Sequence, residues 1–151
     1  MGAVTIRGAT LGDLPSLRRV FRESSLSNVG DRAALLAHPE VLDLSDTAVR
    51  EGRTRAATAG DEVVGFATVA ETNDGIELED LFVDPVWMRQ GVGRALIRDV
   101  VRIAQHRGVR RVVVTANFHA RAFYEGVGFR GEDEVPTPFG MGLRMHLDTA
   151  T

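Results

Sequence analysis

Alternation of apolar and polar residues predicts most of the strands in the first half of the chain. Two alternating runs flank Gly60-Asp61 and predict a hairpin, and the turn sequence Asn73-Asp74-Gly75 leads into a third strand. Earlier in the chain, Asp13 and Pro15 mark the start of an amphipathic helix. The elements predicted for this half are strands at 4–10, 53–59, 62–70 and 76–83, a helix at 11–24, and a less regular helical region at 30–51 that is broken at His38-Pro39.

The second half of the chain changes to helical spacing at Gly91. Apolar residues recur there about once per turn, until His106-Arg107-Gly108 supplies a cationic helix end and a glycine stop. A short β-branched run and a second, shorter helix follow. The elements predicted for this half are a helix from Gly91 to His106, a strand at 111–116, a helix at 119–127, and closing strands at 128–135 and 141–148 around a loop that carries Pro136 and Pro138.

This order of elements predicts an α+β fold, with one mixed and mostly antiparallel sheet flanked by helices. We expect a single domain over residues 1–151, because that length is enough to bury a core. No apolar stretch approaches the roughly 20 residues that cross a bilayer. The N-terminus lacks the basic start and apolar run of a signal peptide. We therefore expect a cytoplasmic protein that does not bind a membrane.

The composition excludes several kinds of chemistry. All 18 basic residues are arginine, and the chain has neither lysine nor cysteine. Lysine-dependent phosphate loops, Schiff bases, disulfides and thiolate zinc sites are therefore excluded. The net charge of −3 gives no reason to expect nucleic acid as a partner. No metal site is predicted, because the four histidines lie far apart without metal-ligand spacing: His38, His106, His119 and His146.

One short stretch, LFVDPVWMRQGVGRAL at 81–96, predicts an anion site. Gly91 and Gly93 stand in the first turn of the predicted helix, where free N–H groups and the helix dipole attract phosphates. Arg89 and Arg94 add permanent positive charge. The pattern fits neither a Walker A loop nor a dinucleotide-binding fingerprint, because the lysine and the third glycine are missing. On this stretch alone, glycines that merely shape the turn explain the pattern equally well.

Two blocks of sequence resemble the GNAT superfamily of N-acetyltransferases. VDPVWMRQGVGRAL at 83–96 is similar to the acyl-CoA signature of that superfamily, and ANFHARAFYEGVGFR at 116–130 is similar to its second block. The separation of the blocks also agrees. The resemblance implies acetyl-CoA as cosubstrate and a sheet that splays between the strands at 76–83 and 111–116. The first Gln/Arg of the family motif falls at Met88, so Arg89 and Gln90 are expected to compensate.

The resemblance also implies roles for individual residues. The main chain of Phe82 and Val83 would pair with the pantetheine arm, which Asn117 and Phe123 would also contact. Tyr124, the only tyrosine, matches the family residue that gives a proton or a hydrogen bond to the departing thiolate. The glycines would then be there for the pyrophosphate. The residues expected to hold the phosphates, mainly through their backbone N–H groups, are Arg89, Gln90, Gly91, Val92, Gly93 and Arg94.

Glu77 and Glu79 are the candidates for the general base. They share one face of the predicted strand, and either could accept the proton of the amine directly or through water. Exposed strand carboxylates without a catalytic role explain each of them at least as well. Ordered water alone performs this step in many members of the superfamily.

The leading prediction is an acetyl-CoA-dependent N-acetyltransferase that modifies a primary amine of a small molecule or peptide by direct attack on the thioester. The alternative is a non-catalytic acyl-CoA-binding sensor or regulatory module, because a fold does not determine function. A third reading is nucleotide binding through the same turn. The sequence identifies neither the acceptor nor the acyl-chain preference. A homodimer is consistent with the resemblance, and the oligomeric state stays open.

Overall fold

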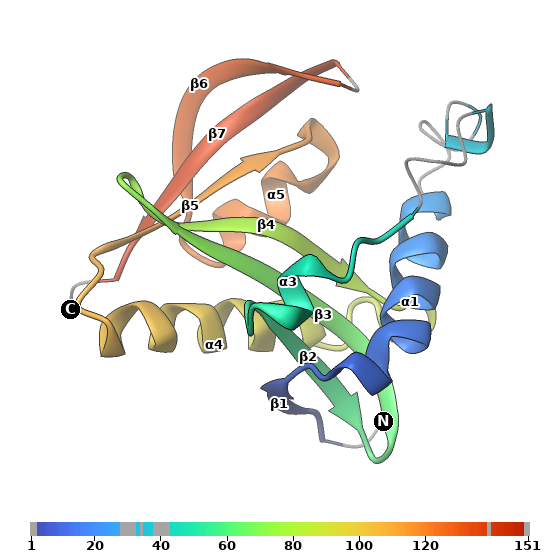
Figure 1. Ribbon diagram of the computed structural model, residues 1–151. Helices are drawn as coiled ribbons and strands as arrows, with labels where there is room; N and C mark the ends of the chain where they lie inside the picture. The colour runs from blue at the N-terminus through green and yellow to red at the C-terminus, as the bar shows by residue number, and fades with distance from the viewer. Residues whose placement is uncertain (1–2, 28–32, 34, 38–42, 139, 150–151) are drawn as a thin grey trace. The chain divides into compact units, whose positions relative to one another are not determined.

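The computed structural model describes residues 3–27, 33, 35–37, 43–138 and 140–149 (Figure 1). The break predicted at His38-Pro39 lies outside the described residues. The strands are β1 (Thr5–Gly8), β2 (Thr54–Ala59), β3 (Glu62–Thr72), β4 (Gly75–Val83), β5 (Arg111–Ala116), β6 (Arg130–Thr137) and β7 (Gly140–Asp148). The helices are α1 (Leu14–Leu26), α3 (Thr47–Arg50), α4 (Val92–His106) and α5 (Arg121–Gly126), with 3-10 turns η1 (Leu11–Asp13), η3 (Pro85–Trp87) and η4 (Phe118–Ala120).

The strands pair in the order β1-β2-β3-β4-β5-β7-β6. Strands β4 and β5 are parallel, whereas β1–β2, β2–β3, β5–β7 and β6–β7 are antiparallel. This confirms the mixed, mostly antiparallel sheet. The parallel ladder joins residues 76–78 to residues 112–114 and does not extend to the next pair, Glu79 and Thr115. The prediction that these two strands part before their ends is therefore confirmed.

The residues form two compact units. The first unit contains residues 1–68 and 80–96, and the second contains residues 69–79 and 97–151. Strands β3 and β4 and helix α4 each contribute residues to both units. No helix in the described parts of the chain is long and apolar enough to span a bilayer.

Helix α1 supplies much of the core of the first unit. Leu14, Leu17 and Val20 recur at helical spacing and are buried. Burying side chains of this size contributes about 1.5–3 kcal/mol each. Two aromatic rings extend this core, because the ring of Phe82 packs edge-on against that of Phe21 with centroids 4.8 Å apart. The end of β4 is thereby attached to α1.

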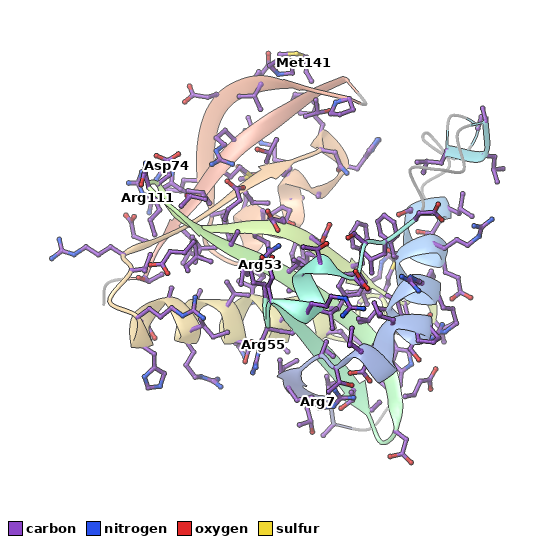
Figure 2. The ribbon with its side chains drawn as sticks, viewed as in Figure 1. Arg7, Arg53, Arg55, Asp74, Arg111 and Met141 are labelled. Carbon is purple, nitrogen blue, oxygen red and sulfur yellow. The ribbon has the colours of Figure 1, made fainter. Side chains whose placement is uncertain are left out.

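The entry into α1 is held by an ion pair between Arg7 of β1, which is labelled in Figure 2, and Asp13 of η1. Arg7 Nη1 and Nη2 donate to the two carboxylate oxygens at 2.7 and 2.9 Å, and the Thr10 amide donates to the same group at 2.8 Å. The hydrogen bonds from Arg7 lower the pKa of Asp13 from 3.8 to about 2. Because the pKa of Asp13 is lower in the folded chain than in the unfolded chain, the ionised carboxylate stabilises the fold at pH values above 3.8. This contribution is lost as the pH falls through about 2.

Replacing Asp13 by asparagine is therefore expected to lower the free energy of unfolding at neutral pH by about 1 kcal/mol. The difference between variant and unaltered chain should shrink as the pH approaches about 2, where the native carboxyl becomes protonated. Urea unfolding at both pH values measures this. A difference of equal size at the two pH values would contradict the assignment.

Strand β5 lies in the middle of the second unit, where Val112, Val113 and Val114 are all buried. Strand β6 is the edge strand, beyond β7. The prediction that Pro136 lies in a loop is wrong, because Pro136 belongs to β6 and is opposite Met141 of β7. An edge strand tolerates proline, since a missing N–H on its outer side costs no ladder hydrogen bond.

Candidate functional site

The glycine turn, residues 88–94, has an unusual backbone. Arg89 and Gly91 have φ values of +63° and +84°, both in the left-handed region. Glycine adopts this conformation freely, whereas another residue loses about 1–2 kcal/mol in it. A Cβ atom added to Gly91 would meet no protein atom within 4 Å. Gly91 is therefore needed for its conformation, and the space beside it is open.

Helix α4 begins directly after Gly91. Its first backbone hydrogen bond runs from the Ala95 amide to the Gly91 carbonyl, at 3.0 Å. The amides of Val92, Gly93 and Arg94 come before this bond and have no acceptor within the helix. Three donors and the positive end of the helix dipole therefore face the turn.

The side chains of the glycine turn add positive charge without neutralising partners. Arg89, Gln90 and Arg94 are exposed, and none of them forms a hydrogen bond or ion pair with the described part of the protein. Met88, at the position of the family's first Gln/Arg, is 39% exposed and offers no donor. The guanidinium groups of Arg89 and Arg94 and the side-chain amide of Gln90 therefore remain available to bind an anion at this helix end.

Gly65 of β3 brings the start of α4 close to the sheet. A Cβ atom there would lie 2.9 Å from Val92 Cγ1 and 3.0 Å from the Phe82 carbonyl oxygen. Both distances are shorter than ordinary van der Waals contact, so only glycine fits without displacing the first turn of α4 or the end of β4. Val92 and Leu96 are buried on this side of the helix. Sequence reasoning did not find this role, although an isolated glycine in a strand can signal close approach.

Asp84, directly after β4, begins the chain segment that leads to the glycine turn. Its side chain accepts a hydrogen bond from the Val86 amide at 3.0 Å and caps η3. The other carboxylate oxygen accepts from Arg19 of α1 at 2.9 Å. Local sequence patterns do not reveal this contact, because 65 positions separate Arg19 from Asp84.

In the second unit, Asn117 and Tyr124 occupy consecutive short helical elements after β5. Asn117 Oδ1 accepts from the Ala120 amide at 2.9 Å and caps η4. Its NH₂ group is not used by this cap. Tyr124 of α5 is 7% exposed, and its ring packs edge-on against Phe123 and Phe129, with centroids 5.2 and 5.3 Å away. Phe123 is 37% exposed, so one of its faces remains accessible.

Burial raises the pKa of Tyr124 above its ordinary value of 10.0. The hydroxyl therefore stays protonated throughout the neutral range and can donate a hydrogen bond. Because the folded pKa is raised, the resulting stability is present below pH 10 and is lost as the pH rises further.

An alkaline titration is expected to show this directly, because Tyr124 is the only tyrosine. The near-ultraviolet absorbance of tyrosinate should appear only above the pH range of a free tyrosine, and together with loss of the folded circular-dichroism signal. Reversible ionisation near pH 10 in the folded protein would contradict the buried position of the hydroxyl.

Glu77 of β4 is engaged by an arginine from β7. Arg144 Nη2 and Nη1 donate to its two carboxylate oxygens at 2.7 and 2.8 Å, and Nη1 also donates to Thr115 Oγ1 at 3.0 Å. The hydrogen bonds to Glu77 raise the pKa of Arg144. Glu79 lies on the same side of β4 and is exposed. Local sequence patterns do not reveal the contact between Arg144 and Glu77, because 67 positions separate the two residues.

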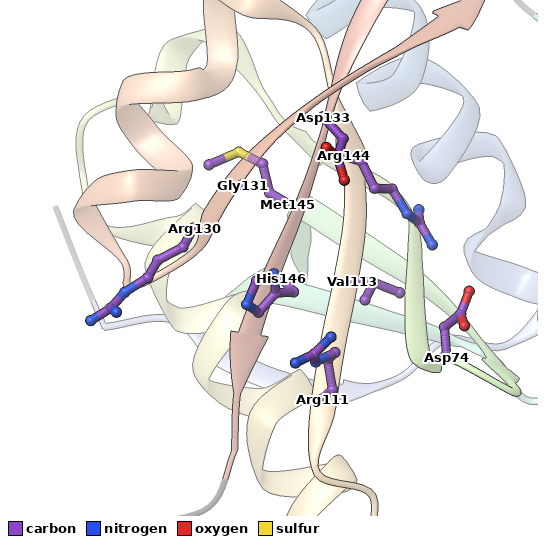
Figure 3. A pocket seen from close by; sticks show the side chains of 9 residues that line it. All are labelled: Asp74, Arg111, Val113, Arg130, Gly131, Asp133, Arg144, Met145 and His146. Carbon is purple, nitrogen blue, oxygen red and sulfur yellow. The ribbon is translucent and has the colours of Figure 1, made fainter.

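A cavity of about 440 Å³ lies in the second unit (Figure 3). Arg144 and Asp74 face the same side of it, whereas Arg130 points away from them. Cationic and acidic side chains both line the cavity, so it has no strong preference for either charge. Its lining residues are Asp74, Arg111, Val113, Arg130, Gly131, Asp133, Arg144, Met145 and His146.

The residues expected to act on the cofactor therefore fall into two groups. Phe82, Val83 and residues 89–94 belong to the first unit. The second unit holds Glu77, Glu79, Asn117, Phe123 and Tyr124. No group of three or more potential metal ligands occurs among the residues that the structure describes.

Comparisons with known proteins identify relatives among N-acetyltransferases. Glucosamine 6-phosphate N-acetyltransferase of Trypanosoma brucei brucei is 36% identical over 56 residues, which are 37% of this chain and 38% of that protein. The ribosomal protein bS18-alanine N-acetyltransferase of Escherichia coli K12 is 35% identical over 75 residues, 48% of this chain and 51% of that protein. The matches to these two relatives thus span about half of their length or less.

The fold has solved counterparts. The PaiA N-acetyltransferase of Thermoplasma acidophilum, solved in complex with coenzyme A, superposes with a TM-score of 0.76 at 17% identity, covering 97% of this chain and 99% of that one. At this identity the likeness shows the fold. The sequence model of the Acetyltransferase (GNAT) family matches residues 17–129, about three quarters of the chain. The chain belongs to the GNAT acetyltransferase family.

Proposed function

We propose that this chain is an acetyl-CoA-dependent N-acetyltransferase that modifies a primary amine of a small molecule or peptide. The observation that carries the proposal is the glycine turn, where outward amides at the start of α4 meet the unpaired cations Arg89 and Arg94. Such a turn suits a diphosphate, because each phosphate oxygen can accept from a backbone amide or a guanidinium group. The single domain over residues 1–151, the cytoplasmic location and the homodimer stay predictions.

The chain's own groups account for the steps of acetyl transfer. In the proposal, the main chain of Phe82 and Val83 pairs with the pantetheine arm, and Asn117 and Phe123 contact it. The Val83 N–H donates to the thioester oxygen, where negative charge develops during attack by the amine. When the tetrahedral intermediate collapses, the C–S bond breaks and the sulfur takes up the electron pair. The Tyr124 hydroxyl then donates its hydrogen bond to that sulfur.

The high pKa of Tyr124 defines the kind of help it can give. Burial raises this pKa, whereas thiols of the cysteine type have pKa values near 8.5. Complete transfer of the phenolic proton to the thiolate is therefore unfavourable at equilibrium. A short hydrogen bond that strengthens as charge develops on sulfur lowers the barrier without such a transfer.

Glu79, which is exposed, is the candidate base in this proposal and acts directly or through water. Both oxygens of Glu77 already accept hydrogen bonds from Arg144, so this carboxylate is engaged within the protein. In this proposal Glu77 binds Arg144 of β7, which also donates a hydrogen bond to Thr115 of β5.

Replacing Glu79 by glutamine is expected to lower kcat about a hundredfold, the low end of the range for general base catalysis. The matched variant Glu77→Gln should change kcat less and should mainly lower the unfolding temperature, because it breaks the pair with Arg144. Steady-state rates across a pH series measure both variants. If Glu79→Gln keeps the kcat and pH profile of the unaltered chain, water alone accepts the proton.

The activity itself is tested by thiol release from acetyl-CoA over a panel of amines, including amino-terminal peptides and amino sugars. The proposal expects release that depends on an amine, with a matching N-acetyl product by mass spectrometry. Binding of CoA without turnover on any amine would instead favour an acyl-CoA-binding module. Equal thermal protection by ATP, NAD and CoA would favour a general nucleotide site.

A further inference from the structure

A partly buried ion pair connects helix α1 to the chain segment before the glycine turn, with Arg19 38% exposed. The Asp84 side chain is 4% exposed, and its Oδ2 accepts from Arg19 Nη1 at 2.9 Å. Arg19 Nη2 donates to the Val63 carbonyl of β3 at 3.1 Å. Removing the partner of a buried carboxylate is strongly destabilising, and Arg19 is the ion-pair partner of Asp84. One guanidinium group thus joins α1, β3 and the end of β4.

Asp84 in turn shapes the backbone that follows it. Its amide donates to the Val64 carbonyl at 2.8 Å, which ties the end of β4 to β3. Its side chain accepts from the Val86 amide at 3.0 Å, and its carbonyl accepts from the Trp87 amide at 2.8 Å. One residue therefore makes three hydrogen bonds that define the path of residues 84–87, directly before the glycine turn.

The glycine turn needs such support, because it contains a strained residue. Arg89 has φ +63° without being a glycine. Backbone strain of this kind persists only where the surrounding structure determines the conformation. The Arg89 side chain has no partner in the described part of the protein, so the restraint reaches it through the backbone. On one side lies the start of α4, and on the other lies the segment fixed by Asp84.

We propose that Arg19 and Asp84 are positioning residues for the glycine turn: they hold its amides in the arrangement that binds the diphosphate of CoA. This inference rests on the proposed function. Neither residue is assigned a contact with the reacting atoms. Arg19 acts through Asp84, and Asp84 acts through the backbone of residues 85–88.

Three variants test the proposal: Asp84→Asn, Arg19→Met and the double variant. The Val86 amide and Arg19 donate to different carboxylate oxygens, and asparagine keeps only one oxygen, so the substitution breaks one of the two bonds. Each single variant is expected to raise the Kd for CoA, measured by calorimetry, about tenfold, comparable to weakening one charge-assisted hydrogen bond. The KM for acetyl-CoA should rise in parallel, while kcat at saturating acetyl-CoA changes little.

The double variant shows whether the two residues act together. If Arg19 acts through Asp84, the double variant should bind CoA no more weakly than the weaker-binding single variant. Additive losses would overturn the link between them. The double variant also covers the case in which a single variant fails to fold, because it removes both charges and leaves no unpaired buried ion.

The exposed pair of Asp46 and Arg50 provides the matched control. Its Nε–Oδ2 distance of 2.8 Å is similar, but its carboxylate is 35% exposed, whereas that of Asp84 is 4% exposed. Asp46→Asn and Arg50→Met are expected to leave the Kd for CoA unchanged. Amide hydrogen exchange without ligand gives an independent readout, in which residues 85–94 should exchange faster in Asp84→Asn and not in Asp46→Asn.

The outcomes separate this inference from the proposed function. An unaltered chain that binds no CoA overturns both. An unaltered chain that binds CoA, together with folded Asp84 and Arg19 variants that bind it equally well and keep the same amide exchange, overturns only the positioning role. Weaker binding with faster exchange confined to residues 85–94 supports it.

Discussion

Replacing Gly91 by valine is expected to raise the Kd for CoA about a hundredfold or more. Gly91 has φ +84°, a conformation that a β-branched residue adopts only with strain. The new side chain would also enter the open space beside the first amides of α4. Losing two charge-assisted hydrogen bonds to phosphate, each about 1.5–3 kcal/mol, corresponds to at least a hundredfold change in Kd.

Gly108, at the opposite end of α4, provides the control for this substitution. It has φ +68°, and a Cβ there would also meet nothing within 4 Å. Gly108→Val should therefore lower the unfolding temperature by a similar amount and leave the Kd for CoA unchanged. Calorimetric titration of both variants, with thermal unfolding in parallel, makes the comparison. Equal affinities of the two variants would show that the glycine turn does not bind the cosubstrate.

Replacing Tyr124 by phenylalanine is expected to lower kcat about a hundredfold, the low end of the range for removing one hydrogen-bond donor from a charge that develops in the transition state. The phenyl ring preserves the edge-on contacts with Phe123 and Phe129, so the stability should change by no more than about 1 kcal/mol. The Kd for CoA should stay the same, because the hydroxyl acts on the developing thiolate and not on the bound ground state.

Single-turnover rates and CoA titrations of Tyr124→Phe separate these effects. A loss of affinity that accounts for the whole loss of kcat/KM would assign Tyr124 to binding. A kcat equal to that of the unaltered chain would remove Tyr124 from the chemistry and would favour water or solvent as the source of the proton.

Local sequence patterns predicted much of the fold and the glycine turn. The strands at 62–70 and 76–83 were found from alternation and from turn residues, and their observed bounds differ by only one or two residues. The glycines of the turn were recognised as part of an anion site because the neighbouring arginines and the start of the helix lie within a few positions of them in the sequence. The left-handed backbone of Gly91 is a finding of the structure and was not predicted.

Interactions between distant residues were not accessible to the same reasoning. Arg144 meets Glu77, and Arg19 meets Asp84, only because β7 and α1 fold against strands far away in sequence. Periodicity shows which face of a strand or helix a residue occupies. It does not show which of the many arginines will contact that residue. The helix predicted at 119–127 begins instead as a 3-10 turn at Phe118, because the Asn117 side chain accepts from the Ala120 amide and caps that turn. Pro136 was placed in a loop because its tolerance on an edge strand depends on strand order.

The central claim is that the backbone amides of the glycine turn hold the diphosphate of CoA. Titration of isotopically labelled protein with CoA, followed by backbone amide NMR, tests it most directly. The account predicts that the largest shift changes fall on residues 89–94 and that they disappear in Gly91→Val. Absence of binding, or shift changes centred on a distant surface such as the cavity around Arg111 and His146, would contradict it.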